Sequence, residues 1–276
     1  MSEKSFYVIA HHCNNRGDIE KVLKKGANAI ECDVSYGKKD DKWCVNHDGY
    51  YPKSSMMLDE WFEEIYNAPH RNRLCFVYLD IKSKTHLDNL ISSVHLCTKK
   101  FIEKEGRIPV PVIYSIDDFK VAEKQFLATA GSLKNWEGFN VDFENDPDTV
   151  NDKYKKIIEH EKVEGRSFNR FFYSDGISVL SDKSVRRRVA RGCQLRDCEQ
   201  VFKKIFSWTI DKKSTALEYL HIGVDGIMTD AGTWLSIDCI DNILNAINVH
   251  NKTYPENAVR IATPDDNLFE VYGSEQ

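Results

Sequence analysis

The sequence lacks the long hydrophobic run, the flexible linker and the excess of positive charge that mark several classes of protein. Nothing in its 276 residues approaches the roughly 20 consecutive apolar residues of a membrane-spanning helix. No stretch rich in proline, glycine or serine divides the chain, so we expect one domain, residues 1–276. Lysine and arginine number 38 against 43 aspartates and glutamates, and this net charge of −5 argues against a nucleic-acid partner.

Cysteine is also sparse, and no leader pattern begins the chain. Several of the eight cysteines lie in apolar runs, and most are expected to be buried free thiols. Cys193 and Cys198 stand close together in a polar segment, which predicts a small disulfide loop if the protein is secreted. Met1–Lys4 leads directly into an apolar run without a signal-peptide core, so we expect a cytosolic protein or a mature form with a start codon added.

What the sequence does have is a repeated alternation of short apolar runs and longer helical patterns. The runs with strand character are Phe6–Ala10, Ala29–Val34, Cys75–Ile81, Val110–Ser115, Phe139–Phe143, Arg170–Ser174, Ile205–Thr209 and Asp225–Thr229. Helical patterns fall near 18–26, 58–68, 86–104, 117–133, 148–161, 178–203, 212–222 and 235–250. Eight such units predict an α/β protein, a (β/α)8 TIM barrel, with a doubly wound open sheet as the alternative.

Two segments stand outside this alternation. Trp43–Asn46 is a short apolar run without a helix before it, and we interpret it as a loop excursion that ends at His47. Residues 260–276 follow the last helical pattern and mix apolar with acidic side chains, so we expect a C-terminal tail that packs back on the barrel.

Acidic side chains gather at the predicted strand ends, where the active sites of such barrels lie. Glu31 and Asp33 are two residues apart on one strand and therefore point to the same side. Asp80 ends the next strand. Carboxylates on one side repel one another unless a cation or protons intervene. Three acids from adjacent strands make an all-oxygen site that suits a hard divalent ion, so we expect Mg²⁺.

Histidines accompany these acids. His11 and His12 end the first predicted strand, and His47 follows the loop excursion. In-line displacement at phosphorus needs charge neutralisation, a base for the entering oxygen and an acid for the leaving one, and imidazole can take either proton role near neutral pH. The combination is therefore typical of phosphodiester cleavage.

Several motifs together resemble one enzyme family. They are His11-His12-Cys13-Asn14, Gly26 to Ser35 (GANAIECDVS), His47, Asp80-Ile81-Lys82, Ser174-Asp175-Gly176, Trp208 to Lys213 (WTIDKK), Gly223 to Thr229 (GVDGIMT) and Ala262 to Asn267 (ATPDDN). With these motifs the chain resembles the sphingomyelinase D/phospholipase D toxins of sicariid spiders, within the wider glycerophosphodiester phosphodiesterase-like barrels. The similarity runs from about residue 6 to residue 272, and the tail is its most specific part.

The resemblance implies a function and a set of roles. Glu31, Asp33 and Asp80 would hold Mg²⁺, and His11 and His47 would act as an acid–base or nucleophile–acid pair. The substrate-binding positions would be Asn14, Lys82 on the phosphate, Ser174, Trp208 in the head-group pocket and Asp211. The family displaces choline or ethanolamine from sphingophospholipids and lysophospholipids, using the lipid's own hydroxyl to give a cyclic phosphate. By resemblance we expect a secreted, monomeric enzyme acting on phospholipid at a membrane surface.

Three departures from the family pattern matter. His12 replaces the methionine that usually follows the first catalytic histidine, and the spacing to Glu31 favours His11 as the catalyst. Residues 48–58 lack the cysteines of the spider toxins. Asp230 stands where the family commonly has asparagine, and an added carboxylate near an ammonium pocket favours a primary ammonium. We therefore expect ethanolamine lipids to be at least as good substrates as choline lipids.

Two other functions compete with this interpretation. A glycerophosphodiester phosphodiesterase would use the same metal and histidines to hydrolyse a soluble substrate, and its product would be a water-derived monoester. A binding module that has lost turnover is disfavoured by the intact acids and histidines.

Overall fold

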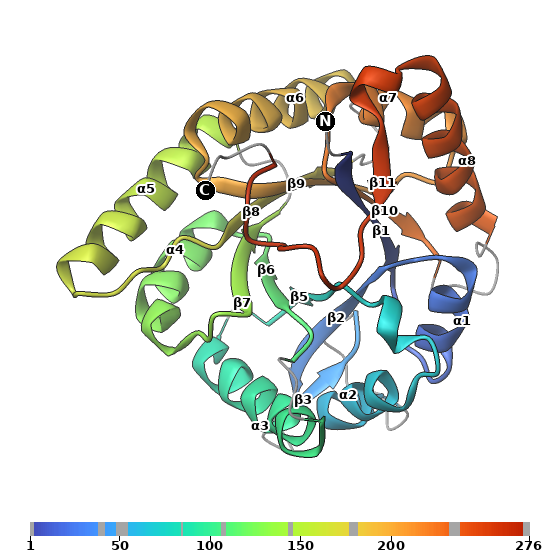
Figure 1. The fold of residues 1–276 in the computed structure, drawn as a ribbon. Helices are drawn as coiled ribbons and strands as arrows, with labels where there is room; N and C mark the ends of the chain where they lie inside the picture. Colours follow the sequence, from blue (N-terminus) through green and yellow to red (C-terminus); the bar gives the residue numbers. More distant parts are fainter. Residues whose placement is uncertain are drawn as a thin grey trace.

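Eight parallel strands form a closed barrel within the part of the chain that the structure describes (Figure 1). The structure is a computed structural model, and it describes residues 3–37, 42–47, 55–83, 85–105, 109–142, 146–176, 182–231 and 238–272. The barrel closes because the first strand pairs with both the second and the last. The barrel strands are β1 (Lys4–His11), β2 (Ala29–Gly37), β5 (Phe76–Ile81), β6 (Val112–Ile116), β7 (Glu137–Val141), β8 (Phe171–Gly176), β9 (Phe202–Trp208) and β10 (Gly226–Asp230).

Helices surround the barrel in Figure 1, each packing an apolar stripe against the strands. They are α1 (Asp18–Lys25), α2 (Leu58–Asn67), α3 (Leu87–Glu105), α4 (Phe119–Thr129), α5 (Pro147–Val163), α6 (Asp182–Glu199), α7 (Lys213–Ile222) and α8 (Asp238–Thr253). Short 3-10 turns lie at Arg71–Arg73, Ala130–Ser132 and Pro255–Asn257. The predicted TIM barrel is confirmed, and no helix in the described ranges has the length and apolarity to cross a membrane.

The inside of the barrel changes character from one end to the other. At the amino ends of the strands, which we call the floor, aromatic rings fill the interior, with Phe76 5.2 Å from Tyr7 and 5.4 Å from Phe206 between ring centroids. At the carboxyl ends, which we call the mouth, the interior is polar: Asn140 donates to the hydroxyls of Tyr78 and Ser174. The apolar floor stabilises the barrel, and the mouth is left for polar chemistry.

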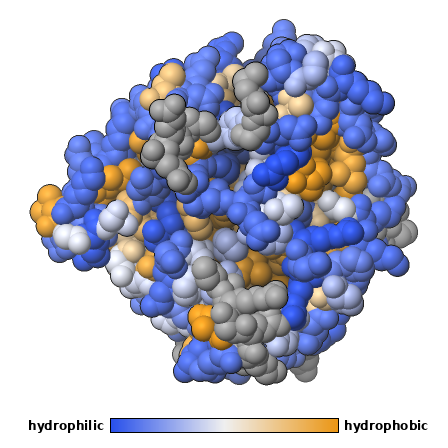
Figure 2. Space-filling view, viewed as in Figure 1, coloured by the Kyte–Doolittle hydropathy of each residue, from blue (hydrophilic) through white to orange (hydrophobic). Residues whose placement is uncertain are grey.

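The tail covers the floor. It begins with β11 (Val259–Ile261), which lies parallel to the start of β1, and it then crosses the barrel in Figure 1. Leu268 is buried in the barrel's inner cluster, where Phe269 also packs. Asn28 ties this arrangement together, because its side-chain amide donates to the carbonyls of Phe6 and Ala262. The same face is mostly hydrophilic in Figure 2, with apolar side chains in separate patches. Residues 273–276 of the expected tail lie outside the described residues.

Two expectations from the sequence are wrong. The run Trp43–Asn46 is not a loop: β3 (Lys42–Val45) pairs antiparallel with β2 and with the short β4 (Met56–Met57). It forms because β2 continues past its last barrel partner to Gly37 and offers an open edge. The predicted Cys193–Cys198 disulfide is absent, since both are free thiols five residues apart on α6, one buried and one exposed. The single-domain organisation stays a prediction.

Candidate active site

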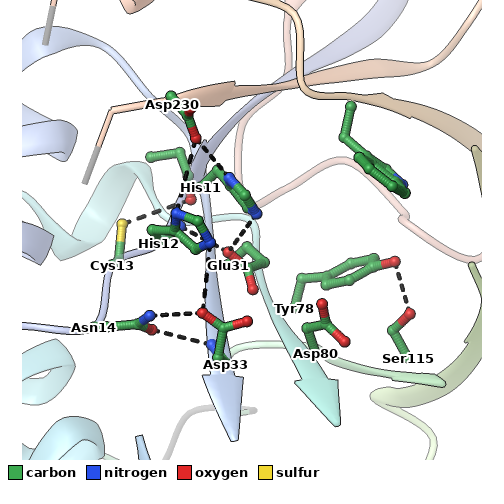
Figure 3. Close-up of polar contacts among 12 residues, drawn as sticks. His11, His12, Cys13, Asn14, Glu31, Asp33, Tyr78, Asp80, Ser115 and Asp230 are labelled. Atoms are coloured by element: carbon green, nitrogen blue, oxygen red, sulfur yellow. Dashed lines mark hydrogen bonds and ion pairs between the residues drawn. The ribbon is translucent and has the colours of Figure 1, made fainter. Parts of the chain in front are cut away.

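The barrel brings the predicted acids and histidines together at the mouth. Asp33 on β2 lies beside Asp80 on β5 in the strand register, and His11 on β1 lies beside Asp230 on β10. Figure 3 shows two imidazoles between Asp230 and the acids of β2. Strand alternation explains the grouping, because residues two apart on β2 face the same side of the sheet.

Glu31, Asp33 and Asp80 form a compact acidic cluster, in which one carboxylate oxygen from each lies within 4.8 Å of the others. Glu31 is 1% exposed and Asp33 is fully buried. Burial, together with the charges of Asp33 and Asp80, raises the pKa of Glu31 to about 8. The cluster therefore carries more negative charge than its surroundings readily stabilise.

Lys82 neutralises part of that charge. Its ammonium lies 3.0 Å from Asp33 Oδ1 and 2.6 Å from Asp80 Oδ2. Although burial opposes the shift, Lys82 and Asn14 hold the pKa of Asp33 below its usual range. Burial raises the pKa of Asp80 despite the same ammonium. Lys82 was expected on the substrate phosphate, and in this structure it bridges two of the three acids.

The third acid fits a bound cation. Glu31 Oε1 is buried and accepts no hydrogen bond from any described residue, while Glu31 Oε2 accepts the backbone N–H of His12 at 2.7 Å. A buried carboxylate oxygen without a donor is costly unless a positive charge faces it. This oxygen belongs to a cluster of three carboxylates, and carboxylate oxygens are the ligands that a hard divalent ion prefers.

His11 is held between two acids. Its Nδ1 lies 2.7 Å from Asp230 Oδ1, and its Nε2 lies 3.6 Å from Glu31 Oε2. Although burial opposes it, the charges of Glu31 and Asp230 raise the pKa of the imidazole to about 9. Asp211 in turn accepts the backbone N–H of Asp230 at 2.9 Å and the hydroxyl of Thr229 at 2.8 Å. Asp230 thus orients His11, and Asp211, which the resemblance gave an orienting role in the head-group pocket, supports Asp230. The sequence did not indicate the link from these two acids to His11.

His12 lies closer to the centre of the site than the sequence suggested. Its ring stacks on His11 with centroids 3.7 Å apart, and the His47 ring stands perpendicular to it at 5.5 Å. Its backbone is left-handed, with φ at 58°, an uncommon conformation for a non-glycine residue that occurs often at functional sites. Burial and the neighbouring His11 lower the pKa of His12 to about 4. His47 itself is exposed.

The predicted substrate-binding residues fall into two groups. Asn14 is engaged on both sides by Asp33, donating to Oδ2 at 2.6 Å and accepting the Asp33 backbone N–H at 3.0 Å, so it positions that acid. Ser174 is 1% exposed, and its hydroxyl lies 3.0 Å from that of Tyr78 in the buried polar network. Both side chains are thus hydrogen-bonded to other residues of the mouth.

Trp208 ends β9 on the other side of the mouth. Its indole N–H donates to Asp142, which follows β7. Gly176 makes this position possible, because a Cβ there would lie 2.1 Å from the indole ring. Sequence reasoning missed Asp142, although it stands at a strand end like the acids that were recognised.

These features define a class of protein: a parallel-barrel enzyme with a cluster of acids and histidines at the carboxyl ends of its strands, of the metal-dependent phosphodiesterase type. The family model described as Sphingomyelinase D/Phospholipase D matches residues 1–267, and the chain belongs to this family. Its enzymatic activity is therefore of the phospholipase D type.

Individual relatives agree with this assignment. The chain is 27% identical to the dermonecrotic toxin LamSicTox-alphaIC1 of Loxosceles amazonica, over 96% of this chain and 99% of the toxin. It is 26% identical to the dermonecrotic toxin LdSicTox-alphaIB3b of Loxosceles deserta, with the same coverage. A glycerophosphodiester phosphodiesterase from Parabacteroides distasonis shares the fold, with a TM-score of 0.55, 16% identity and coverage of 88% of this chain and 99% of that one.

Proposed function

We propose that the protein is a Mg²⁺-dependent phospholipase D that removes choline or ethanolamine from sphingophospholipids and lysophospholipids and leaves a cyclic phosphate. The observation that carries the proposal is the meeting of three acids and three imidazoles at one barrel mouth, where a buried oxygen of Glu31 accepts no hydrogen bond from the described residues. Family membership supplies the phospholipase D chemistry.

Glu31, Asp33 and Asp80 would hold the ion, whose charge would stabilise the nonbridging phosphate oxygens. Asn14 fixes Asp33 in place, and Lys82 supplies a further positive charge beside the phosphate. Side chains at the mouth carry out the proton transfers.

Two histidines divide the proton transfers. Glu31 is one of the charges that raise the pKa of His11, so with that charge neutralised the pKa would fall and the ring would serve as the base. The lipid hydroxyl would then attack phosphorus as its proton passes to Nε2 of His11, while Asp230 accepts from Nδ1 and keeps that ring oriented. His47 gives a proton to the head-group oxygen as its bond to phosphorus breaks. The products are a cyclic phosphate and a free amino alcohol, and no water is consumed.

The head group would rest against Trp208, whose ring face attracts an ammonium group. Asp142 holds the indole by its N–H and adds a negative charge on the same side. Asp230 is 37% exposed and adds a carboxylate at the mouth. We therefore expect ethanolamine lipids to be at least as good substrates as choline lipids, because a primary ammonium donates hydrogen bonds to carboxylates and a quaternary one does not.

Phosphorus NMR of the products from a small lipid panel, with and without chelator, tests the reaction. A chelator-sensitive cyclic phosphate is expected, whereas a water-derived monoester would instead indicate a hydrolytic glycerophosphodiesterase. The head-group preference is tested by the ratio of ethanolamine to choline turnover in the wild type and in Asp230→Asn. The ratio is the informative quantity because Asp230 also holds His11, and a choline preference that the substitution leaves unchanged contradicts the expectation.

The partner and location follow from the same proposal. We propose a secreted monomer acting on phospholipid at a membrane surface, without a nucleic-acid partner, and the toxin names of the relatives support secretion. The free thiols do not support secretion, because most structural cysteines in oxidising compartments are paired in disulfides. Six of the eight cysteines are buried, however, and a buried thiol has little access to a pairing partner. Fractionation of the producing cells and medium tests the location, and retention inside the cell would contradict it.

A further inference from the structure

We propose that His12, Asp33 and His47 form a second metal site, which takes a borderline divalent ion such as Zn²⁺ beside the acidic cluster. One side-chain ligand atom from each of the three residues lies within 4.8 Å of the others. His12 Nε2 is 3.7 Å from Asp33 Oδ2, close to the separation of two ligands on one tetrahedral ion. The inference concerns regulation of the site assigned above, so its consequence for turnover rests on the proposed function.

The two oxygens of Asp33 face different partners. Oδ1 lies on the side of the acidic cluster, 3.0 Å from Lys82, whereas Oδ2 lies on the side of His12. Asn14 donates to Oδ2 at 2.6 Å and fixes the carboxylate plane, as supporting hydrogen bonds do for metal ligands. Asp33 is thus placed to bridge two ions, the arrangement found in two-metal phosphodiesterase chemistry.

The donor set distinguishes the two positions. The acidic cluster offers only carboxylate oxygens, which suit Mg²⁺, while the second position offers two imidazole nitrogens and one carboxylate oxygen, a ligand set of zinc centres. His12 is 30% exposed and His47 is exposed, so an ion reaches them from solvent. An ion held there engages the imidazole that the proposed reaction needs as its acid, and zinc therefore lowers head-group release without displacing magnesium.

Zinc binding to the magnesium-saturated full chain, measured by competition with a chromophoric chelator, tests the site. We expect one zinc ion per wild-type chain. Loss of a ligand in His12→Met or His47→Asn should weaken binding by at least about 100-fold, the upper end of what outer-shell changes cost. His12→Met keeps the backbone N–H that Glu31 accepts, and thermal unfolding checks that both variants fold. His221→Gln, an exposed histidine on α7, is the matched control and should bind zinc as the wild type does.

A second readout identifies the ligands. Cobalt bound to two imidazoles and a carboxylate in a tetrahedral site absorbs visible light far more strongly than cobalt in an octahedral all-oxygen site, so the intense band should appear in the wild type and vanish in His12→Met. The proposal is overturned if the magnesium-loaded wild type binds no zinc, or if zinc binding survives both histidine changes and is lost in Asp80→Asn, which would place the ion in the acidic cluster.

The binding readout contains no lipid, so it separates this inference from the proposed function. Zinc binding as expected, with no magnesium-dependent head-group release, supports the second site and contradicts the phospholipase assignment. Magnesium-dependent head-group release with no zinc binding supports the phospholipase assignment and contradicts the second site.

Discussion

Buried acids at the two ends of the barrel differ in how fully they are paired and in the direction of their pKa shifts. At the floor, the buried Asp225 receives Lys4 at 3.0 Å, the guanidinium of Arg196 and the backbone N–H of Ile205 at 2.7 Å. These partners hold its pKa below the usual range, although burial opposes the shift. At the mouth, burial instead raises the pKa of Glu31, and one of its oxygens accepts no hydrogen bond from the described residues. The paired charges at the floor stabilise the fold, whereas the incompletely paired acids at the mouth are suited to binding a ligand.

The largest expected effect is a loss of activity at the mouth that far exceeds any loss of stability. His11→Asn should reduce head-group release by about 10²- to 10⁴-fold, the usual contribution of a general acid or base. The free energy of unfolding should fall by too little to account for this loss, because asparagine can still hydrogen-bond to Asp230. Turnover and urea unfolding of the same preparation check both parts, and an unfolding loss that accounts for the missing activity would remove the contrast between the two ends.

The opposite pattern is expected at the floor. Arg196→Met leaves Asp225 buried with one partner fewer, and breaking a buried pair costs about 3–5 kcal/mol of unfolding free energy. Head-group release per folded molecule should not change. Arg186→Met is the control, since Arg186 on α6 pairs with Glu218 on α7 at the protein surface and such pairs contribute about 0–1 kcal/mol. Equal losses in the two variants would contradict the structural role given to Asp225.

The sequence predicted which residues lie at the mouth better than it predicted the contacts among them. Apolar runs gave the eight strands, and strand alternation was enough to place Glu31 and Asp33 on one face. The pairing of His11 with Asp230 was not predictable, because it depends on β1 and β10 closing the barrel across 219 residues.

The remaining omissions share this dependence on packing. The stacking of His12 follows from a left-handed backbone that periodicity does not reveal. β3 pairs with the part of β2 that extends beyond its pairing with β5, and the sequence does not show where that pairing stops. The network around Tyr78 and Asn140 joins four strands inside the barrel, so no single segment indicates it.

Acid unfolding sharpens the comparison further. The folded-state pKa of Asp225 is depressed, so the stability it contributes is fully present above its unfolded pKa of about 3.9 and is lost as pH falls through and below that value. In Asp225→Asn the unfolding free energy should be lower at pH 6 and less dependent on pH below about 4. Denaturant unfolding across this range measures both, and parallel pH profiles in the two proteins would exclude Asp225 as the source.

The smallest effect is a gain in stability at the mouth. Folding must either bury the Glu31 charge beside two other acids or add a proton to it, and Glu31→Gln removes this cost. In the absence of divalent ions the free energy of unfolding should therefore rise by about 1 kcal/mol, as often happens when functional groups are removed. Denaturant unfolding in chelator measures the change. A large loss instead would mean that Glu31 is a structural acid like Asp225.

Magnesium binding to the metal-free protein tests the central claim most directly, because Lys82 already bridges two of the three acids. Calorimetric titration should show one Mg²⁺ per chain in the wild type and no binding in Asp80→Asn, with head-group release requiring the ion. If the wild type bound no magnesium and released the head group equally well in chelator, Lys82 alone would balance the acids, and the account of the mouth as a metal-dependent site would be wrong.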